Sequence, residues 1–543
     1  MRATMQNVPL SLNHFLERAG KLFPRTEIVS RLPDKSYVRH TYADYYLRTR
    51  QLASALLAAG LKKGDRVATL CWNHHAHLEC YLGIPAAGGV MHTLNLRLSP
   101  EELGLIAAHA DDRVLIVDDV LLPLYRQFAH LHQFEHVIVY SFSGEALPAD
   151  MTDYDSLIGS ADGEAFIYPA HAETDPIAMC YTSGTTGLPK GVVYSHRSTI
   201  LHTLVASLGD FWGLKGSDVV LPVTPMFHAN CWGVPYGAVM MGAKLVFPGP
   251  HLHAEDLLDL MTLEPPTLSL GVPTIWMRLI EVYDAALKPG HAQHGRWKLP
   301  QSMRSLVGGA AVPESLIRAF DAHGIWLLQG WGMTETSPLA TVSYPKVELR
   351  NVSMDERYRR AAMAGVPVPL VDLRLQGEDG VDAPWNGQSA GEIQVRGPFV
   401  TGSYHQTPLT ADKFTADGWL RTGDIATVDE LGFVRITDRS KDLIKSGGEW
   451  ISSVDMENAL MAHPAVAEAA VIAIPDAKWS ERPLACVVFR EGQSAEKIEL
   501  DAHLERHRFA KWQLPERYEF IDAVPRTSTG KFWKLRLREM FPR

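Results

Sequence analysis

The chain has 543 residues, of which 46% are hydrophobic and 21% are charged, and its formal net charge is −10. This composition is typical of a globular protein with about two to four domains, and it excludes a disordered, collagen-like or coiled-coil chain. The excess of acidic residues also argues against a dedicated nucleic-acid binder.

The cysteines and the apolar stretches indicate the compartment. The chain has 5 cysteines and no CxxC pair, so free thiols in a reducing compartment are expected rather than a disulfide framework. Residues 1–16 lack the apolar run of a signal peptide, and no stretch reaches the ~20 apolar residues that span a bilayer. We therefore expect a soluble cytoplasmic protein.

Helical and strand patterns alternate along most of the first part of the chain. Residues 43–59 have the periodicity of an amphipathic helix that ends at Gly60. Short apolar runs at 65–71, 114–117 and 136–140 predict buried strands. Strands that alternate with helices favour α/β layers with a largely parallel sheet.

A β-rich region is predicted after about Gly365. Residues 371–375 and 392–397 alternate apolar and polar side chains, as half-buried strands do, and residues 427–436 predict a hairpin. A small α+β unit should then follow, with a helix at 453–462 and strands at 467–474 and 484–489. The predicted fold class is α/β, with a large N-terminal domain of several subdomains, one of them β-rich, and a small α+β C-terminal domain.

The charge is unevenly distributed between residues 1–438 and residues 439–543, which we expect to be the two domains. Residues 439–543 contain 17 basic and 16 acidic side chains, whereas the first 438 residues contain 35 basic and 46 acidic ones. The acidity therefore belongs to the large N-terminal part. The basic tail after Arg526 is most simply a solvated face.

The strongest local signal is a loop rich in glycine and hydroxyl side chains at residues 181–191, which follows the apolar run 177–180. Glycines let the backbone approach a ligand closely, while hydroxyls, backbone N–H groups and Lys190 can donate to phosphate oxygens. The spacing is not that of a Walker loop, and a flexible turn is the alternative. The density of donors favours phosphate binding.

Five segments resemble, in the same order, motifs of the adenylate-forming enzymes, the superfamily of acyl-CoA synthetases, adenylation domains and beetle luciferases. The loop at 181–191 resembles the first motif, and the others are residues 329–338, 418–424, 438–449 and 525–531. The resemblance extends over residues 177–534, and the combination of motifs is highly specific. The chain is most similar in character to medium- and long-chain fatty acyl-CoA synthetases and to methylmercaptopropionate-CoA ligases.

This resemblance implies an AMP-forming acid–CoA ligase that uses ATP, Mg²⁺ and coenzyme A. A carboxylate would attack the α-phosphorus of ATP and release pyrophosphate, and a thiol would then attack the acyl-adenylate. Two anions meet in the first step, so cations and oriented N–H donors must neutralise the developing charge. The resemblance assigns Mg²⁺ to Glu335 and Thr185, and catalytic roles to Lys531, Glu335, Arg439 and His228.

The resemblance also assigns the nucleotide contacts. Asp424 resembles the carboxylate that accepts both ribose hydroxyls, and Lys531 resembles the lysine that bridges the substrate carboxylate and the α-phosphate. Trp331 stands where the family usually has a tyrosine that stacks on adenine, so an aromatic face is retained. The other predicted nucleotide- or CoA-binding residues are Thr182, Ser183, Gly184, Thr185, Thr186, Lys190, Gly309, Ala310, Gln329, Gly330, Gly332, Thr334, Ile436, Arg439, Lys441, Gly447, Gly448, Glu449 and Trp450.

A mobile C-terminal domain is a further implication of the resemblance. The domain would rotate about a hinge at Lys441 after adenylation. The rotation would withdraw Lys531 and bring Gly447, Gly448 and Glu449 to the site, where the glycines allow the pantetheine arm of CoA to approach. One active site would then serve both reactions.

The acyl-binding segment is expected around residues 225–232. The predicted substrate contacts are Trp232, which resembles a residue that gates the fatty-acid tunnel, together with His228, Gly308, Gly332 and Pro338. Residues 226–240 contain no Asp or Glu, which favours an uncharged acyl chain over an amino acid. We therefore predict a fatty acid as the substrate.

Three alternatives stay open at this point. A ligase for a short-chain, methylthio- or aryl-carboxylic acid would use the same residues. An acyl-AMP ligase that loads a carrier protein usually carries an insertion that this chain does not show, and a non-catalytic nucleotide-binding protein would not require Lys531, Glu335 and Asp424. The expected partners are small-molecule substrates, with no nucleic acid and at most peripheral membrane contact, and the family allows a homodimer.

Residues 71–80 suggest a different chemistry. They include six side chains that can ligate a metal, namely Cys71, His74, His75, His77, Glu79 and Cys80. Such a cluster could indicate zinc. The segment also resembles a strand-to-helix junction of these ligases, which favours a structural role.

Overall fold

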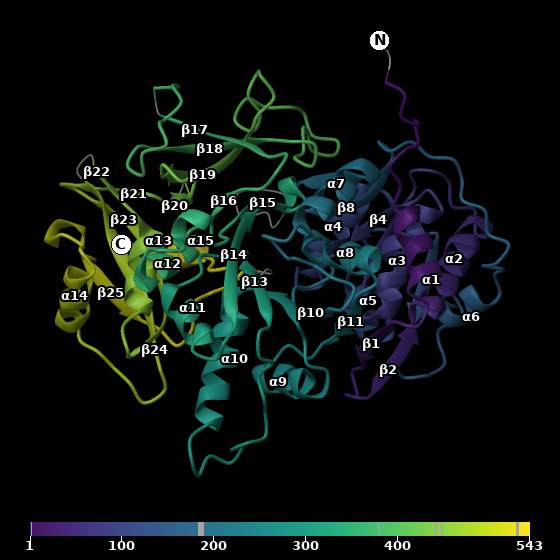
Figure 1. Ribbon diagram of the computed structural model, residues 1–543, viewed down its shortest axis with the longest axis horizontal. Coiled ribbons are helices and arrows are strands. Elements are labelled where there is room, and N and C mark those ends of the chain that lie inside the picture. The colour runs from purple at the N-terminus through teal and green to yellow at the C-terminus, as the bar shows by residue number, and fades with distance from the viewer. Residues whose placement is uncertain are drawn as a thin grey trace.

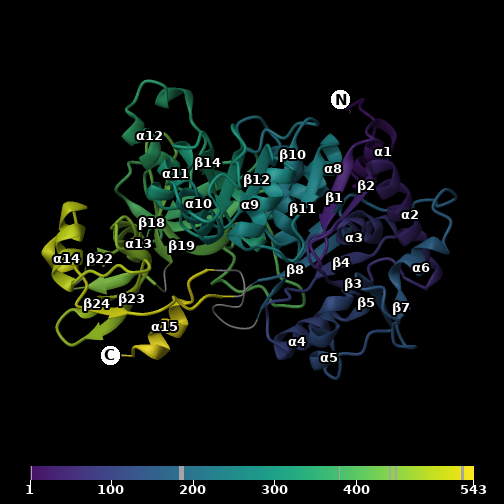
Figure 2. The ribbon, with the colours of Figure 1, turned by 90° about the horizontal axis from the view of Figure 1, so that it is seen from below.

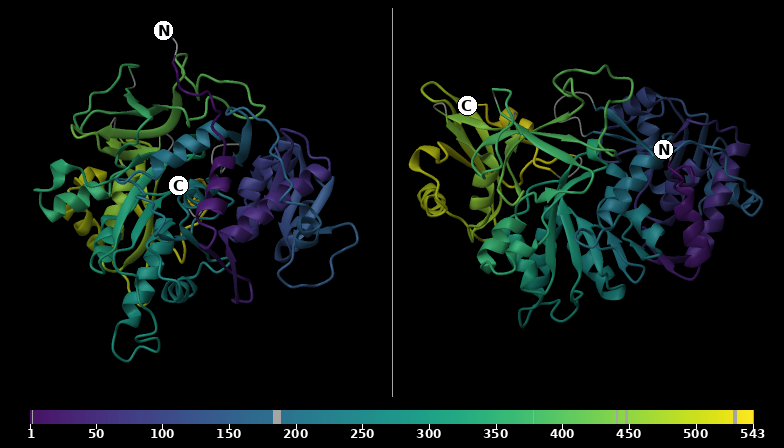
Figure 3. Two further views of the ribbon diagram at one scale, coloured as in Figure 1. Left: turned by 45° about the vertical axis from the view of Figure 1, so that its right-hand side comes forward. Right: turned by 45° about the horizontal axis from the view of Figure 1, so that its top comes forward.

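The computed structural model describes residues 1, 3–182, 189–377, 379–439, 442–446, 449–527 and 531–542. Within these residues the strands form four sheets, two of them large (Figure 1). The N-terminal elements lie at one end of the molecule and the C-terminal elements at the other, as the views from other directions also show (Figures 2 and 3).

The first large sheet is built by the N-terminal part of the chain. Its strands, as far as the described residues show, follow the order β7-β6-β5-β3-β4-β8-β9, and all neighbours are parallel except β8 and β9. The strands are β3 (Arg66–Leu70), β4 (Val90–Thr93), β5 (Asp112–Asp118), β6 (His136–Tyr140), β7 (Thr152–Asp153), β8 (Pro176–Tyr181) and β9 (Gly191–Ser195). The associated helices are α3 (His75–Ala86), α4 (Pro100–Ala110), α5 (Leu122–Phe128) and α6 (Tyr154–Gly159).

The second large sheet has the described order β16-β15-β14-β13-β12-β10-β11-β1-β2, with parallel pairs at its centre and antiparallel pairs at both edges. The strands are β1 (Glu27–Arg31), β2 (Tyr37–Thr41), β10 (Val219–Pro222), β11 (Lys244–Phe247), β12 (Leu268–Gly271), β13 (Arg304–Gly308), β14 (Trp326–Gly332), β15 (Leu339–Val342) and β16 (Val366–Pro367). The associated helices are α1 (Asn13–Leu22), α2 (Tyr42–Ala58), α7 (His196–Ala206), α8 (Val234–Met241), α9 (Ala254–Leu263), α10 (Pro273–Ala286), α11 (Glu314–Asp321) and α12 (Met354–Ala361).

The two large sheets share one hydrophobic core. Consecutive strand residues face opposite sides of a sheet, so each strand contributes to two clusters. Val67 on β3 and Ile28 on β1 belong to the shared cluster, together with residues of α2, α3, α7 and α8. The next residues, Ala68 and Val29, face outward against α4 and α5 and against α9, α10 and α11, respectively. Burial on both faces explains why these strands are continuous apolar runs in the sequence.

Local sequence explains where several helices begin. Thr41 and Asp44 form a capping box at the start of α2, and Ser99 and Glu102 form another at the start of α4. Pro100 occupies the first turn of α4, where a missing N–H costs nothing. Each box satisfies backbone N–H groups that the helix itself leaves unpaired.

The β-rich region forms an antiparallel sheet of order β17-β18-β19-β20 in the described chain, above the large sheets in Figure 1. Its strands are β17 (Asp372–Gln376), β18 (Ala390–Arg396), β19 (Leu420–Val428) and β20 (Val434–Arg439). The predicted hairpin is present, because Val428 pairs with Val434 across the turn.

The C-terminal unit has its own sheet and its own core. The described strands are β21 (Ile444–Ser446), β22 (Glu449–Ile451), β23 (Val466–Asp476), β24 (Ser480–Phe489) and β25 (Arg517–Phe520), and the helices are α13 (Ser453–Met461), α14 (Lys497–Arg506) and α15 (Lys534–Met540). Leu460, Val471 and Leu500 are among the side chains that are fully buried between the sheet and the helices.

The predicted α/β fold class, with a β-rich subdomain and a small α+β C-terminal unit, is confirmed. The predicted domain division at residues 438 and 439 falls at the end of β20, before β21 begins at Ile444, and it stays a prediction. In the described part of the chain, every helix is too short or too polar to cross a membrane.

Candidate active site

A cavity of about 720 Å³ lies where the two large sheets, the four-stranded sheet and the C-terminal unit meet. It brings together many of the predicted residues, although they come from segments far apart in the chain. The predicted residues that line it are Thr182, Lys190, His228, Trp232, Gly308, Gly309, Gly330, Trp331, Gly332, Thr334, Glu335, Pro338, Arg439 and Lys531.

Other predicted residues lie elsewhere or outside the described chain. Asp424 lies directly behind the cavity wall, whereas Ala310, Gln329, Ile436, Glu449 and Trp450 do not line the cavity. The predictions for Ser183, Gly184, Thr185, Thr186, Lys441, Gly447 and Gly448 fall outside the described residues. The roles assigned to all of these residues stay predictions.

Asp424 is held by two cavity residues. It pairs with Arg439 across β19 and β20, and this register places the Arg439 Nε 3.2 Å from Asp424 Oδ1. The Trp331 indole N–H donates to Asp424 Oδ2 over 2.9 Å. The tryptophan that replaces the family's usual tyrosine therefore offers its ring to the cavity and also orients the carboxylate behind it.

Glu335 lies in the short 3₁₀ turn η3 (Thr334–Thr336), directly after β14, and is 6% exposed. The Tyr404 hydroxyl donates to Glu335 Oε1 over 2.7 Å, and no Lys, Arg or His of the described chain forms an ion pair with Glu335. A buried carboxylate that faces a cavity and has no cation of the described chain at ion-pair distance is costly unless a further cation binds there. Glu335 therefore fits the role of a Mg²⁺ ligand, since this ion usually takes one or two protein carboxylates.

Lys531 reaches the cavity from the C-terminal unit. Burial, and then the positive charge of Arg439, lower the pKa of Lys531 to about 8, while Asp424 and Glu335 act in the opposite direction. The ammonium group thus lies among the same charged residues that the sequence motifs single out. A bound anionic ligand would stabilise its charged form.

His228 is a neutral residue of the cavity. Burial, and then the charges of Lys531 and Arg97, lower the pKa of His228 to about 3. The imidazole can donate or accept a hydrogen bond near neutral pH, but it carries no charge there. The catalytic role predicted for His228 is therefore limited to that of a neutral partner.

Small residues allow close approach at the carboxyl ends of β13 and β14. Gly308 and Gly330 are paired between these strands, and a Cβ atom at Gly308 would lie 2.7 Å from the Gly330 carbonyl oxygen. The Trp232 indole packs over the same strand end, 3.6 Å from that Cβ position. Any side chain at Gly308 would therefore displace the neighbouring strand at Gly330.

Trp232 is presented by an unusual turn. Residues Ala229–Gly233, which form η2, all have positive φ, from 43° at Ala229 to 81° at Gly233. Left-handed backbone at non-glycine residues costs about 1–2 kcal/mol each and tends to occur at functional sites. Nothing in the local sequence indicates this turn, so the sequence alone did not predict it.

The apolar part of the cavity is lined by Trp212, Trp232, Leu306 and Leu339. Trp212, Leu306 and Leu339 were not predicted, and neither were the polar lining residues Glu392, Tyr404, Asp412 and Lys413. Their sequence surroundings are those of ordinary core or loop residues. Only the tertiary structure brings them to the cavity.

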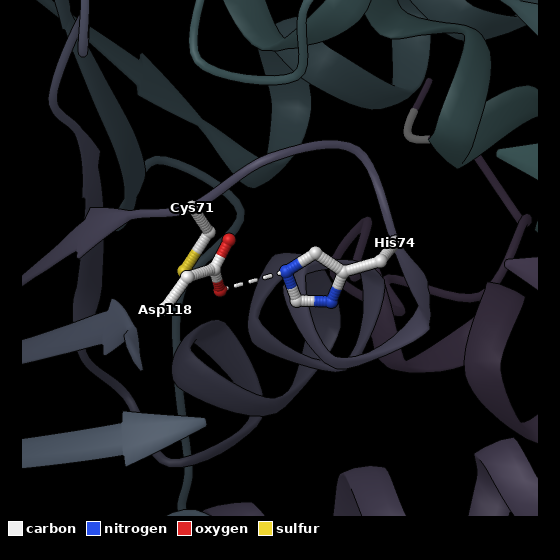
Figure 4. A group of neighbouring side chains, drawn as sticks. All are labelled: Cys71, His74 and Asp118. Atoms are coloured by element: carbon white, nitrogen blue, oxygen red, sulfur yellow. Dashed lines mark hydrogen bonds and ion pairs between the residues drawn. The ribbon is translucent and has the colours of Figure 1, made fainter. Parts of the chain in front are cut away.

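The histidine and glutamate side chains of segment 71–80 bind protein partners. Cys71, His74 and Asp118 lie close together and are buried (Figure 4). The His74 Nε2 lies 2.9 Å from Asp118 Oδ1, and His74 Nδ1 accepts from the His77 N–H, so neither ring nitrogen is left for a metal. Glu79 is bound by Arg48 and Tyr154. These bonds support the structural role at the β3–α3 junction.

Comparison with known proteins identifies relatives over the whole chain. The model described as AMP-binding enzyme matches residues 16–405, and the model described as AMP-binding enzyme C-terminal domain matches residues 455–531. A long-chain-fatty-acid–CoA ligase of Thermus thermophilus is 48% identical over 99% of this chain and 97% of its own length. A 3-methylmercaptopropionyl-CoA ligase of Ruegeria lacuscaerulensis is 42% identical over 100% and 99%, respectively.

Solved structures show the same similarity. An anthranilate CoA ligase in complex with anthranoyl-AMP superposes with a TM-score of 0.86 at 25% identity, covering 99% of both chains. ATP-bound MatB from Rhodopseudomonas palustris superposes with a TM-score of 0.80 at 27% identity, covering 98% of this chain and 99% of its own.

Proposed function

The chain belongs to the AMP-binding enzyme family, and on this premise we propose that it is an AMP-forming fatty acid–CoA ligase. It joins a carboxylic acid to the AMP part of ATP, which gives an acyl-adenylate and releases pyrophosphate. It then transfers the acyl group from the adenylate to the thiol of coenzyme A, which releases AMP. The observation that carries the proposal is that Lys531 of the C-terminal unit lines the same cavity as Glu335 and Arg439.

The first step requires the charge that these residues supply. Lys531 is a flexible cation that can contact both the carboxylate of the acid and the α-phosphate of ATP. Its positive charge reduces the electrostatic repulsion between these two anions. Asp424, oriented by Trp331 and Arg439, accepts the ribose hydroxyls. Glu335, with Thr185 as the second predicted ligand, would hold Mg²⁺, which would neutralise further phosphate charge.

The apolar part of the cavity supports an uncharged acyl chain. Trp212, Trp232, Leu306 and Leu339 offer no charge to an amino or second carboxyl group. The neutral His228 lines the same cavity, where it can donate a hydrogen bond to a carboxyl oxygen of the acid.

The second step involves a different face of the C-terminal unit. We assign Glu449 and Trp450 on β22, with Gly447 and Gly448, to the approach of CoA. Residues 1–438 and 439–543 act as the two domains, and Lys441 acts as the hinge between them. The enzyme functions in the cytoplasm in lipid metabolism, with small molecules as its partners, at most peripheral membrane contact, and a homodimer as the oligomer that the family allows.

A second candidate substrate is a methylthio-carboxylic acid. Two 3-methylmercaptopropionyl-CoA ligases, from two species of Ruegeria, are 42% and 41% identical to this chain over its full length. The machinery for ATP and CoA would be unchanged, and only the occupant of the apolar part would differ.

A screen of acids tests the function. CoA-dependent AMP release is measured with straight-chain acids of two to eighteen carbons, methylthio acids, aryl acids and amino acids. The greatest kcat/KM is expected with a fatty acid of medium or long chain. A preference for methylthio, short or aryl acids would correct the substrate, and pyrophosphate release without CoA dependence would favour a carrier-protein ligase. No AMP release with any acid would contradict the ligase function.

A further inference from the structure

We propose that Tyr404 is a positioning residue for the metal-binding carboxylate Glu335, and that it couples this carboxylate to the phosphate loop. The inference rests on the proposed function, since it assigns Glu335 to the metal that accompanies ATP. Tyr404 lies in the segment between β18 and β19, 69 residues after Glu335, and none of the sequence motifs includes it.

Two hydrogen bonds hold Glu335 from this segment. The buried Tyr404 hydroxyl donates to Glu335 Oε1 over 2.7 Å, and the Thr401 backbone N–H donates to the Glu335 carbonyl over 2.8 Å. Both the side chain and the backbone of Glu335 are therefore fixed by the same loop. Tyr404 itself is 7% exposed and lines the cavity.

The same segment also holds the end of the phosphate loop. The Lys190 ammonium lies over the Tyr404 ring, 5.0 Å from its centroid, and the His405 N–H donates to the Gly191 carbonyl over 2.8 Å. A cation over an aromatic face is attracted by the ring. Tyr404 thus contacts both Lys190, the proposed phosphate-binding lysine, and the Glu335 carboxylate.

This geometry would help a single carboxylate to hold a metal. The hydrogen bond from Tyr404 to Oε1 restricts the orientation of the Glu335 carboxylate, and Oε2 would then be the oxygen that faces a metal. Groups that orient a ligating carboxylate typically contribute 10- to 100-fold to metal affinity. Without the hydroxyl, Glu335 would lose part of its orientation but not its charge.

The test compares two tyrosines that differ in their acceptors. Tyr404→Phe removes the bond to Glu335 but keeps the ring under Lys190. Tyr194→Phe is the matched control, because the buried Tyr194 hydroxyl donates over 2.8 Å to the neighbouring Thr334 backbone carbonyl and not to the carboxylate. Glu335→Gln serves as the reference for loss of the metal ligand itself.

The readout is the binding of ATP to the full-length protein, measured by calorimetry with Mg²⁺ and with EDTA. The Kd with EDTA divided by the Kd with Mg²⁺ reports how much the metal tightens ATP binding, without any catalytic step. Tyr404→Phe is expected to reduce this ratio about 10-fold or more, whereas Tyr194→Phe is expected to leave it within about twofold. Glu335→Gln is expected to bring the ratio close to one, because the metal ligand itself is lost. Thermal midpoints of the two tyrosine variants check that both fold.

Two results would overturn the proposal. The first is a ratio of Kd values that is unchanged in Tyr404→Phe although Glu335→Gln reduces it to about one. The second is an equal reduction of the ratio in Tyr404→Phe and Tyr194→Phe, which would indicate a general structural role. Failure of the ligase function is distinguishable, because it would appear as no acid-dependent AMP release by the unmodified protein while the metal-dependent binding of ATP persists.

Discussion

Lys531 combines a position among charged groups with a lowered pKa. Its ammonium group faces the cavity, where Arg439 repels its positive charge and Asp424 and Glu335 attract it. A compact cation in this position can respond strongly to an anionic substrate.

Substitution Lys531→Ala should abolish the first half-reaction selectively. Loss of one preorganised donor to a developing charge typically costs about 10²–10³ in rate, and acid-dependent exchange of pyrophosphate into ATP should fall by at least that factor. Transfer of a supplied acyl-adenylate to CoA should be spared, because Lys531 acts on the phosphate in the first step only. An equal loss of both half-reactions would reject the assigned role.

The pH dependence of the first half-reaction should reflect the same ammonium group. Because the pKa of Lys531 is lowered to about 8 in the free protein, the charged form disappears as the pH rises through 8. The kcat/KM of acid-dependent pyrophosphate exchange should therefore fall above pH 8, by about tenfold per unit at the limit. Lys531→Arg keeps its charge over this pH range, so its kcat/KM should not fall above pH 8. If kcat/KM of Lys531→Arg also falls above pH 8, another titrating group is responsible for the pH dependence.

At the scale of elements, the apolar end of the cavity depends on the packing of α7, α8 and the strand ends. Trp212 is 1% exposed, and the tip of its ring approaches Gly233 and Gly237 at the start of α8. If the acid occupies the apolar part of the cavity, as proposed, the Trp212 side chain fills space that a longer acyl chain would need. The left-handed turn at Ala229–Gly233 presents Trp232 to the same region.

Trp212→Leu should therefore shift the preference toward longer acids. One additional methylene accommodated in an apolar pocket is worth about 10- to 200-fold in kcat/KM, so the ratio of activities on longer and shorter acids should rise by at least tenfold. Trp276→Leu is the matched control, since Trp276 is equally buried but belongs to the separate core of α9, α10 and α11. Equal profiles in the two variants would remove Trp212 from the acyl site.

A buried ion pair joins the last helix to the C-terminal core. Lys534 on α15 lies 2.8 Å from Glu457 on α13 and also donates to Ser453. Burial alone would lower the pKa of Lys534, but Glu457 and Asp438 raise it, and burial raises the pKa of Glu457. Because Lys534 follows Lys531 by three residues, this pair also fixes the segment that carries the cavity lysine.

Lys534→Met should destabilise the protein by about 3–5 kcal/mol, because it leaves the Glu457 carboxylate buried without its partner. The second substitution Glu457→Gln should restore a large part of this loss, since a neutral amide still accepts the bond from the Val471 N–H. Chemical unfolding monitored in the C-terminal unit measures both variants. A double variant less stable than Lys534→Met would contradict the ion-pair explanation.

At the scale of the whole molecule, the structure corresponds to only one of the two proposed steps. Lys531 lines the cavity, whereas Glu449 and Trp450 on β22 do not. If both sets of residues serve one site, the C-terminal unit must rotate between the steps. Contacts that cross the predicted domain division, such as the Ser453 N–H donating to Asp438 over 2.9 Å, stabilise the present arrangement.

Lys441→Pro should separate the two steps at this scale. Proline fixes φ near −65° and removes an N–H, so it restricts the backbone change that a hinge must make. Pyrophosphate exchange should remain within about threefold of the unmodified protein, while overall acyl-CoA formation should fall by at least tenfold. A Pro substitution at Lys478, an exposed residue between β23 and β24, controls for general damage. Retained acyl-CoA formation in Lys441→Pro would reject the hinge.

Sequence and structure agree where the relevant information is local or motif-based. The helix predicted at 43–59 is α2, the strand predicted at 136–140 is β6, and the hairpin at 427–436 joins β19 and β20. The resemblance to adenylate-forming enzymes is confirmed by matches to both family models. Apolar periodicity, capping residues and turn chemistry are properties of neighbouring residues, so the sequence alone determined these elements and the family.

Only the tertiary structure decided which distant residues meet in the cavity. The Tyr404–Glu335 and Trp331–Asp424 bonds join residues 69 and 93 positions apart, and Trp212 reaches the apolar end from a segment with no recognisable motif. The left-handed turn before α8 likewise has no local signature. These features depend on how sheets and loops pack, because the free energy that holds a strained turn or a buried hydrogen bond comes from the surrounding fold rather than from the neighbouring residues.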